Sequence, residues 1–373
     1  MKLTIERAAL LKSLAHVQSV VERRTTIPIL SNVKLEGRSG VLSLNATDMD
    51  LDIIESVAAD VVRPGATTAP AHTFYEIVRK LPEGSQVEIE VTGEDGGQMT
   101  LRSGRSKFSL ACLPVEDFPV LSGGELPYSF GLTAAELKTL IDRTRFAIST
   151  EETRYYLNGI YLHAANGIDG DVLRAVATDG HRLARVEITL PSGAAGMPGV
   201  IVPRKTVAEI RKLIDETDAE ITVSLSETKI KFAFGDAVLT SKLIDGTFPD
   251  YERVIPAGND KALVVNCKSF AQAVDRVSAI STEKSRAIKL TLEKGTATLS
   301  ASSPENGSAV EEIEADYQST PLEIGFNSRY LMDILAQVEG DSAQFAMADA
   351  ASPTVVREVS DASAIYVLMP MRV

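Results

Sequence analysis

Hydrophobic and polar residues alternate along most of this chain, which is the pattern of half-buried strands. Gly- and Asp-rich breaks such as residues 93–97 separate the alternating segments. We therefore predict antiparallel sheets, built from hairpins, that keep one solvated face. The clearest period-two segments are residues 41–44, 86–91, 99–101, 220–225 and 289–292.

Helical periodicity is confined to a few segments, each with an apolar stripe that predicts an amphipathic helix on a core. Thr133 is the expected N-cap of one of them, with Glu136 at the capping-box position. The six predicted helices cover residues 7–21, 73–81, 133–147, 204–214, 268–280 and 328–338.

These helices recur at a nearly constant distance. Leu11 lies 126 residues before Leu137, which lies 133 residues before Phe270. The second helix of each pair follows the same rhythm, with 133 residues from Phe74 to Val207. We predict an α+β fold of three similar domains, each with two helices and two antiparallel sheets. The predicted domains are residues 1–126, 127–258 and 259–373.

Composition narrows the class of protein. The 373 residues are 44% hydrophobic, which excludes a disordered chain. No apolar run approaches the roughly 18–20 residues that span a bilayer, and the first residues lack the pattern of a signal peptide. Cys112 and Cys267 are too few for a disulfide framework or a four-cysteine zinc site, so we expect reduced thiols in a cytoplasmic protein without a membrane partner.

Charge is segregated along the chain. The net charge of −13 argues against a protein that coats DNA, unless the positive charge gathers on one surface. Residues 102–107 hold Arg102, Arg105 and Lys107 without an acid, whereas residues 302–323 hold six acids without a base. Such complementarity suits a head-to-tail contact between subunits, which closes a ring if the rotation allows.

Candidate chemistry is sparse: no Walker A loop, no dinucleotide-binding glycine motif and no His-Glu-x-x-His occurs. Asp48-Met49-Asp50-Leu51-Asp52 lacks the glycine and terminal glutamate of a calcium loop. Its alternation favours an edge strand with Met49, Leu51 and Ile53 inward and the aspartates outward. Asp179-Gly180-His181-Arg182 offers an acid–base pair without a nucleophile motif, whereas Asp-Gly favours a turn that leads into a strand.

The segment Met369-Pro370-Met371-Arg372-Val373 has two explanations. Methionines around a proline form a pliable apolar surface for varied partners. Alternatively, the segment is a terminal strand whose methionines fill a core. The segment alone does not decide between them.

Taken together, the motifs of this chain resemble those of the bacterial sliding clamp, the β subunit of DNA polymerase III, over essentially the full length. The motifs that carry the resemblance are Thr26-Ile27-Pro28-Ile29-Leu30, Pro64-Gly65-Ala66-Thr67-Thr68, Leu101-Arg102-Ser103-Gly104-Arg105-Ser106-Lys107-Phe108, Arg154-Tyr155-Tyr156-Leu157-Asn158-Gly159, Ala177-Thr178-Asp179-Gly180-His181-Arg182-Leu183, Val202-Pro203-Arg204-Lys205, Phe248-Pro249-Asp250-Tyr251, Ile324-Gly325-Phe326-Asn327 and Met369-Pro370-Met371-Arg372.

The resemblance implies a DNA-clamp fold of three domains and a head-to-tail homodimer that forms a ring. Such a ring encircles duplex DNA without reading sequence and tethers the replicative polymerase, which confers processivity. It has no catalysis and needs no cofactor or metal. The implied partners are duplex DNA, a second copy of the chain, a clamp loader, and polymerases or repair proteins that carry short clamp-binding peptides.

The resemblance also implies a peptide-binding groove, in which the Asp-Gly-His-Arg turn and the methionine tail become two walls of one pocket. Leu, Val, Pro and Met supply an apolar floor, and the basic residues supply a polar rim. Asp250 is expected to order the Pro249 turn rather than to touch a ligand. The implied groove residues are Arg154, Tyr156, Leu157, Thr178, Gly180, His181, Arg182, Leu183, Pro249, Arg253, Val254, Pro353, Val367, Met369, Pro370, Met371 and Arg372.

Two further sets follow from the resemblance. The DNA-facing positions are Arg24, Tyr155, Tyr156, Arg204, Lys205, Lys284, Arg286, Asn327 and Tyr330. The sequence departs from the family pattern at His72 and Glu151, which are therefore left out of that set. The subunit contact is expected to use Arg102, Arg105, Lys107, Phe108 and Leu110 on one side and Ala279, Ile280, Glu311, Glu312 and Glu314 on the other.

Two alternatives stand beside the clamp. One is a scaffold, built from the same repeats, that does not bind DNA. The other is a hydrolase that uses Asp179 and His181, against which the missing nucleophile and cofactor loops argue.

Overall fold

The helices form where the periodicity predicts them. The computed structural model describes residues 1–92, 97–121, 124–217, 219–281 and 286–373. Within these residues the α-helices are α1 (Arg7–Val20), α2 (Ala71–Lys80), α3 (Ala134–Asp142), α4 (Arg204–Ile214), α5 (Cys267–Ser278) and α6 (Ser328–Leu335). Short 3₁₀ segments are η1 (Pro28–Ser31), η2 (Val115–Asp117), η3 (Arg145–Ala147), η4 (Glu152–Leu157) and η5 (Tyr251–Val254).

The capping box at the start of α3 is confirmed. The backbone N–H of Glu136 donates to Oγ1 of Thr133 at 3.2 Å, and the backbone N–H of Thr133 donates to Oε2 of Glu136 at 2.8 Å. Both bonds satisfy N–H groups that a helix start leaves without a partner. Helix α3 is shorter than predicted, because it ends at Asp142 and η3 follows it.

The strands form antiparallel sheets, as the alternation predicts. Their orders are β5-β1-β7-β8-β9, β10-β15-β16-β17-β4-β3-β2-β6, β14-β11-β12-β13-β26-β25-β24-β18-β22 and β21-β20-β19-β23. Their bounds are β1 (Lys2–Glu6), β2 (Asn32–Arg38), β3 (Val41–Thr47), β4 (Leu51–Ala58), β5 (Asp60–Arg63), β6 (Gly65–Pro70), β7 (Gln86–Thr92), β8 (Gln98–Ser103), β9 (Ser106–Ala111), β10 (Tyr128–Leu132), β11 (Gly159–Asn166), β12 (Asp171–Thr178), β13 (Arg182–Thr189), β14 (Val200–Pro203), β15 (Ile221–Leu225), β16 (Lys229–Phe234), β17 (Ala237–Lys242), β18 (Lys261–Asn266), β19 (Ala287–Glu293), β20 (Thr296–Ser303), β21 (Gly307–Glu314), β22 (Asp316–Tyr317), β23 (Leu322–Asn327), β24 (Ser342–Met347), β25 (Thr354–Glu358) and β26 (Ala364–Leu368).

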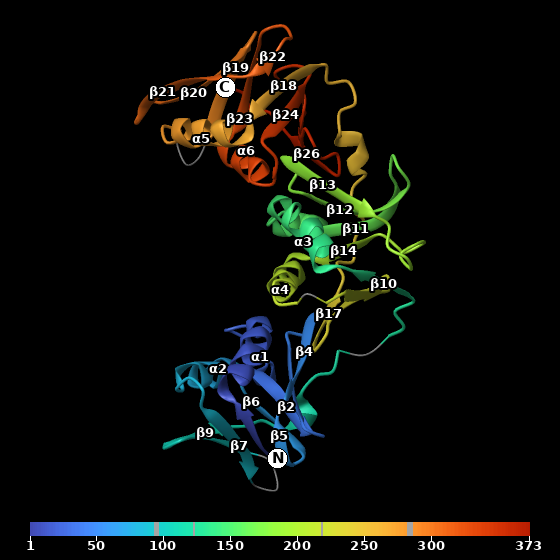
Figure 1. Cartoon of the computed structure of the whole chain (residues 1–373), viewed down its shortest axis with the longest axis vertical. Coiled ribbons are helices and arrows are strands. Elements are labelled where there is room, and N and C mark those ends of the chain that lie inside the picture. The colour runs from blue at the N-terminus through green and yellow to red at the C-terminus, as the bar shows by residue number, and fades with distance from the viewer. Residues whose placement is uncertain (93–96, 122–123, 218, 282–285) are drawn as a thin grey trace. The chain divides into compact units, whose positions relative to one another are not determined.

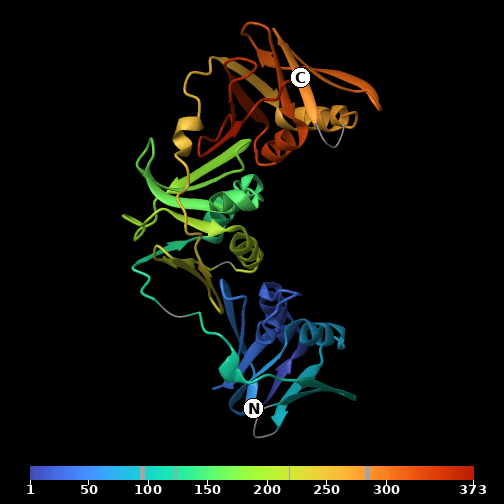
Figure 2. The same ribbon diagram turned by 180° about the vertical axis from the view of Figure 1, so that it is seen from behind.

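The chain divides into two compact units. The first holds Met1–Leu137, Pro191–Pro198 and Lys205–Leu243, and the second holds Lys138–Leu190, Gly199–Arg204 and Ile244–Val373. Helices α1 and α2 lie side by side in the first unit, as both views show (Figures 1 and 2), and α5 packs on α6 in the second. Each unit contains part of the middle repeat, so the division into two units does not coincide with the three predicted domains. The domain borders predicted at residues 126/127 and 258/259 therefore stay a prediction.

Each third of the chain repeats one order of elements. The third strand after the first helix of each third is β4, β13 or β21, and the third and last strand after the second helix is β9, β17 or β26. This order bears out the α+β fold of three similar domains. Neighbouring repeats are joined by one rule: β17 pairs with β4, and β26 pairs with β13. The sheets of neighbouring repeats are therefore fused edge to edge.

A buried histidine lies at the β4–β17 junction, inside the first unit. Nδ1 of His16, on α1, lies 2.6 Å from Oε2 of Glu55 on β4, and Nε2 lies 2.8 Å from Oε1 of Glu216, just after α4. Ser13 donates a further bond to Glu55 at 2.9 Å. Burial lowers the pKa of His16, but the bonds to Glu55 and Glu216 outweigh it and raise the pKa above its ordinary value of 6.5. The two ring nitrogens thus tie α1 to β4 and to the end of α4, and the raised pKa favours the protonated ring.

The aspartate string beside this junction differs from the prediction. Asp48 begins a turn, in which its Oδ1 accepts from the backbone N–H of Asp50 at 2.9 Å and of Leu51 at 2.7 Å. Met49 has φ 78° and is 44% exposed, so it does not face inward. Leu51 and Ile53 are buried as predicted, but Asp52 is buried as well. The predicted edge strand is wrong, because β4 is an inner strand between β3 and β17.

The cysteines are unpaired, as predicted: Cys112 is half-buried and Cys267 is buried. Burial raises the pKa of both thiols. Among the described helices, none is long and apolar enough to cross a membrane.

Candidate functional site

A mostly apolar pocket of about 340 Å³ lies in the second unit. It is built from η4, the turn between β12 and β13, the segment that contains η5, and β26. The residues that line it are Arg154, Tyr156, Leu157, Thr178, Gly180, Arg182, Leu183, Pro249, Asp250, Tyr251, Val254, Val367 and Met369.

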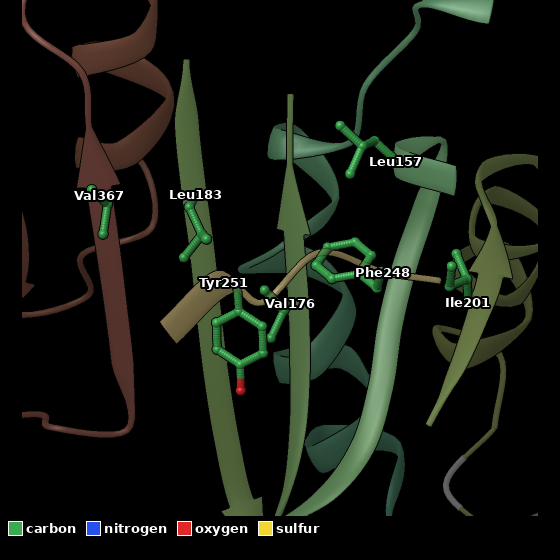
Figure 3. Packing of buried hydrophobic residues seen from close by; sticks show 7 residues of the cluster. All are labelled: Leu157, Val176, Leu183, Ile201, Phe248, Tyr251 and Val367. Carbon is green, nitrogen blue, oxygen red and sulfur yellow. The ribbon is translucent and has the colours of Figure 1, made fainter. Parts of the chain in front are cut away.

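Strand pairing brings two walls of this pocket together. Leu183 on β13 lies opposite Val367 on β26, so both side chains leave the sheet on the same face. Figure 3 shows the segment with Phe248 and Tyr251 crossing the strands that carry Val176 and Leu183. The buried residues of this cluster form the floor below the pocket.

The turn between β12 and β13 forms as the Asp-Gly pair predicts. Oδ1 of Asp179 accepts from the backbone N–H of His181 at 2.9 Å and of Arg182 at 3.0 Å, and Gly180 has φ 88°, which favours glycine. The backbone N–H of Met369 donates to the carbonyl of His181 at 2.9 Å. The turn and the methionine tail therefore meet, as the groove prediction requires.

Arg182 lines the pocket, but its guanidinium is engaged within the chain. Its side chain is only 8% exposed and bonds Oδ2 of Asp333 at 2.5 Å, Oδ2 of Asp179 at 3.2 Å and the carbonyl of Phe146 at 2.6 Å. Its guanidinium also lies 4.3 Å from the ring centre of Tyr330. Acceptors of its own chain hold the guanidinium, and the rim role of Arg182 stays a prediction. The same bonds engage Asp179, and no acid–base pair of Asp179 with His181 forms.

Six predicted groove residues do not line the pocket. The tail turns away after Met369, since the backbone N–H of Met371 donates to the carbonyl of Gly325 at 2.7 Å. The six are His181, Arg253, Pro353, Pro370, Met371 and Arg372.

Conversely, Asp250 and Tyr251 line the pocket although the sequence reasoning left them out. The sequence contained an indication of this role, because both residues belong to the Phe248-Pro249-Asp250-Tyr251 motif. The carboxylate of Asp250 also bonds Nε of Arg253 at 2.7 Å.

The predicted DNA-facing residues have different surroundings in the two units. Arg24 and Arg204 are exposed, and Tyr155 is 54% exposed. Lys205 is engaged within the first unit, where its Nζ bonds Asp48, the carbonyl of Val20 at 3.2 Å and Oε1 of Glu22 at 3.4 Å.

Like Tyr155 and Arg204, the remaining predicted DNA-facing residues belong to the second unit. Asn327 caps α6, since its Oδ1 accepts from the backbone N–H of Arg329 at 3.0 Å and of Tyr330 at 3.3 Å. Tyr156 lines the pocket, and Arg286 is half-buried with φ 44°. Lys284 lies outside the described residues.

The two residues left out of the DNA-facing set have partners in the chain. The ring nitrogens of His72 lie 2.8 Å from Oε1 of Gln18 and 3.1 Å from the carbonyl of Val21. Oε2 of Glu151 accepts from Nε of Arg154 at 2.7 Å.

The residues of the predicted subunit contact lie on or beside two edge strands. Strand β9 ends the five-stranded sheet, with exposed Lys107 and Phe108, and Arg102 and Arg105 are exposed next to it. Leu110 is 8% exposed and packs on its own core instead, on the face of β9 that it shares with Phe108.

Strand β21 ends the four-stranded sheet, with exposed Glu312 and Glu314. Val310 on β21 is 71% exposed and was missed by the sequence reasoning. Glu311 bonds Arg276 at 2.5 and 3.0 Å. After α5, Ala279 is exposed and Ile280 is half-buried.

Among the described residues, no group of three His, Cys, Asp or Glu side chains is placed to hold a metal ion.

Family comparisons cover nearly the whole chain. Residues 1–122, 131–250 and 252–372 match the N-terminal, central and C-terminal domains of the DNA polymerase III beta subunit. The beta sliding clamp of Caulobacter vibrioides NA1000 is 56% identical over 373 residues, and that of Escherichia coli K12 is 40% identical over 375 residues. Both alignments cover 100% of each chain.

Solved structures agree. A Caulobacter crescentus beta sliding clamp with polyethylene glycol bound to its putative beta-motif tethering region has a TM-score of 0.98 and 55% identity, over 100% of this chain and 99% of that one. A Bartonella birtlesii sliding clamp bound to griselimycin has a TM-score of 0.97 and 52% identity, over 100% of both chains. Sliding clamps are processivity factors rather than enzymes, so the hydrolase alternative is wrong. The fold and the full-length matches together show that this chain belongs to the family of the DNA polymerase III beta subunit, the beta sliding clamps.

Proposed function

We propose that two copies of this chain join head to tail into a closed ring around duplex DNA. The pocket of the second unit then holds the peptide motifs of the polymerase, the clamp loader and repair proteins. Such a ring confers processivity on replication and works in the cytoplasm, on the nucleoid.

The strand pairing between repeats carries this proposal. Within the chain, β17 pairs with β4 and β26 pairs with β13. In both pairs, the third strand after the second helix of one repeat joins the third strand after the first helix of the preceding repeat. Strands β9 and β21 are the corresponding strands that have a neighbour on one side only. The same rule pairs β9 of one copy with β21 of another, which is a heterologous contact that can close a ring.

The side chains of the two edge strands suit this pairing. Around β9 they are basic, with Arg102, Arg105 and Lys107, and along β21 they are acidic, with Glu312 and Glu314. Phe108 and Val310 are apolar and exposed, so they supply area that the contact can bury. The charged side chains then set the orientation of the two subunits, and the apolar side chains provide most of the affinity of the contact.

Binding to DNA needs only weak contacts in such a ring. A chain with net charge −13 repels phosphate over most of its surface, whereas Arg24 and Arg204 are exposed cations. Contacts to phosphate carry no base readout, so the ring slides without sequence preference.

The ring is tested by the topology of the DNA. We expect protein that a competent loader has placed on closed circular DNA to stay bound, and to leave when one cut makes the circle linear. Equal retention on both forms contradicts encirclement. No retention on either form, with a loader that is active on its own clamp, favours the scaffold alternative.

The pocket is tested with a labelled peptide of the Gln-Leu-x-Leu-Phe type, whose binding fluorescence anisotropy reports. We expect Met369→Ala and Pro249→Ala to weaken binding at least tenfold, because both side chains line the pocket. Met371→Ala and Pro353→Ala are matched controls from the same predicted groove that lie outside the pocket, and we expect them to bind like the wild type. Equal loss in all four variants, or no binding by folded wild type, contradicts this site.

A further inference from the structure

One wall of the pocket is not part of any sheet. Pro249, Asp250, Tyr251 and Val254 lie between β17 and β18, in a segment whose only regular structure is the short η5. A segment without ladder hydrogen bonds needs side-chain anchors to hold its position. The buried members of this segment are Phe248 and Tyr251, which are 8% and 6% exposed.

Tyr251 is anchored through its hydroxyl group. The oxygen lies 3.0 Å from Nε2 of His163 on β11 and 3.3 Å from Nη1 of Arg174 on β12. The carbonyl of Ala164 lies 3.0 Å from Nδ1 of His163, and a carbonyl only accepts, so Nδ1 carries the proton. Nε2 of the neutral ring then accepts the hydroxyl hydrogen of Tyr251, while the hydroxyl oxygen accepts from Arg174.

Phe248 reaches the same histidine through a stack of rings. Its ring lies parallel to that of Tyr161, with centres 4.8 Å apart and an angle of 6° between the planes. Tyr161 in turn stacks on His163 at 4.6 Å and 26°. His163 is therefore in contact with both anchoring systems of the wall, although it does not line the pocket.

We propose that His163 is a positioning residue for peptide binding, and that protonation of its ring loosens the wall that Tyr251 forms and so weakens peptide binding. The proposal rests on the proposed function of the pocket. A protonated ring has no lone pair at Nε2, so the hydroxyl hydrogen of Tyr251 loses its acceptor. A second cation would then stand next to Arg174.

The charges around His163 favour the neutral ring. Arg174 bonds Oε2 of Glu187 on β13 and Oε1 of Glu252 on η5, both at 2.7 Å, and Arg185 on β13 lies 4.0 Å from Glu187. Burial lowers the pKa of His163 below its ordinary value of 6.5; the bond to the Ala164 carbonyl and the charge of Glu252 oppose this shift, and the positive charge of Arg174 adds to it. The anchor is therefore intact at neutral pH and is lost as the pH falls through this lowered pKa.

The test follows the affinity for the Gln-Leu-x-Leu-Phe-type peptide by anisotropy between pH 7.5 and pH 5. We expect the wild type to weaken about threefold to tenfold across this range, which is the order expected for one lost buried hydrogen bond. His163→Gln retains an acceptor that does not titrate, so we expect near wild-type affinity at pH 7.5 and a flat profile. His181→Gln, at an exposed histidine near the turn, is the control and should keep the wild-type fall.

The possible results distinguish the inference about His163 from the assignment of the pocket as the peptide site. Wild-type binding with a flat profile, or a fall that survives in His163→Gln, overturns the inference and leaves the pocket assignment intact. No wild-type binding at pH 7.5 overturns the assignment itself. Nitrogen-15 NMR of the imidazoles in the free protein gives an independent readout. We expect the Nδ1–H form for His163 at neutral pH, and an Nε2–H form would overturn the inference without any peptide.

Discussion

Replacing His16 by glutamine tests whether an imidazolium ties α1 to the β4–β17 junction. In the wild type, both ring nitrogens lie within 2.8 Å of a carboxylate oxygen. The side chain of Glu55 is 8% exposed, whereas that of Glu216 is 38% exposed. The bond to Glu55 is therefore shielded from water, and the bond to Glu216 is partly screened.

The expected loss follows from these exposures. Removing one partner of a buried ion pair costs about 3–5 kcal/mol, and a surface pair contributes about 1 kcal/mol or less. Glutamine still donates one neutral hydrogen bond, which restores about 1 kcal/mol. We therefore expect His16→Gln to lose about 2–5 kcal/mol near pH 6, or about 4–20 °C in the melting temperature of the first unit.

The sign of the pH dependence separates an imidazolium from a neutral ring. Because the folded pKa of His16 is raised, its contribution is complete below about pH 6.5, the unfolded value, and is lost as the pH rises through the folded pKa. The difference in melting temperature between wild type and His16→Gln should thus shrink from pH 6 to pH 9.5. Circular dichroism at several pH values measures this difference.

A matched control comes from the same unit. The ring of His72 bonds an amide oxygen and a backbone carbonyl rather than carboxylates. We therefore expect His72→Gln to cost about 1 kcal/mol at every pH. A difference for His16→Gln that stays constant or grows toward alkaline pH would refute the imidazolium.

Two further predictions concern other charges. Burial raises the pKa of Asp52 to about 6, so the charged form of this carboxylate destabilises the folded state above that pH. We expect Asp52→Asn to stabilise the first unit by up to about 3 kcal/mol at pH 8 but not near pH 4, as measured by thermal unfolding. Equal effects at both pH values contradict the buried charge. Reversing Glu312 and Glu314 to lysine should raise the dimer dissociation constant about tenfold to a hundredfold at 0.1 M salt and less at 0.5 M, as measured by sedimentation. Glu323→Lys, on the opposite edge strand of the same sheet, is the control, and an unchanged constant in the double variant rejects the β21 contact.

The sequence predicted the elements well where local physics defines them. The six helices, the capping box of Thr133 with Glu136, and the turn at Asp179 all depend on residues within a few positions of one another. Strand pairing puts Leu183 and Val367 on one face, and both line the pocket, whose role as the peptide groove stays a prediction.

The errors arise where distant parts of the chain meet. Asp52 alternates with Leu51 and Ile53, which predicts an outward side chain, but Asp52 is buried on a strand that has a neighbouring strand on each side. Nothing local reveals that Arg182 pairs with Asp333, which lies 151 positions away. The groove role of the tail beyond Met369 stays a prediction, and nothing in the sequence indicates that Met371 pairs with Gly325.

Sequence by itself determined the repeated order of helices and strands, because hydrophobic periodicity selects an element and its buried face. Only the tertiary structure decided which strands join the repeats, since periodicity carries no information about the edges of a sheet. The pairs β17–β4 and β26–β13 are fixed by the packing of whole repeats, and they leave β9 and β21 as the edges from which we infer the ring. The anchors of Tyr251 are likewise tertiary, because His163 lies 88 residues from it and Arg174 lies 77 residues from it.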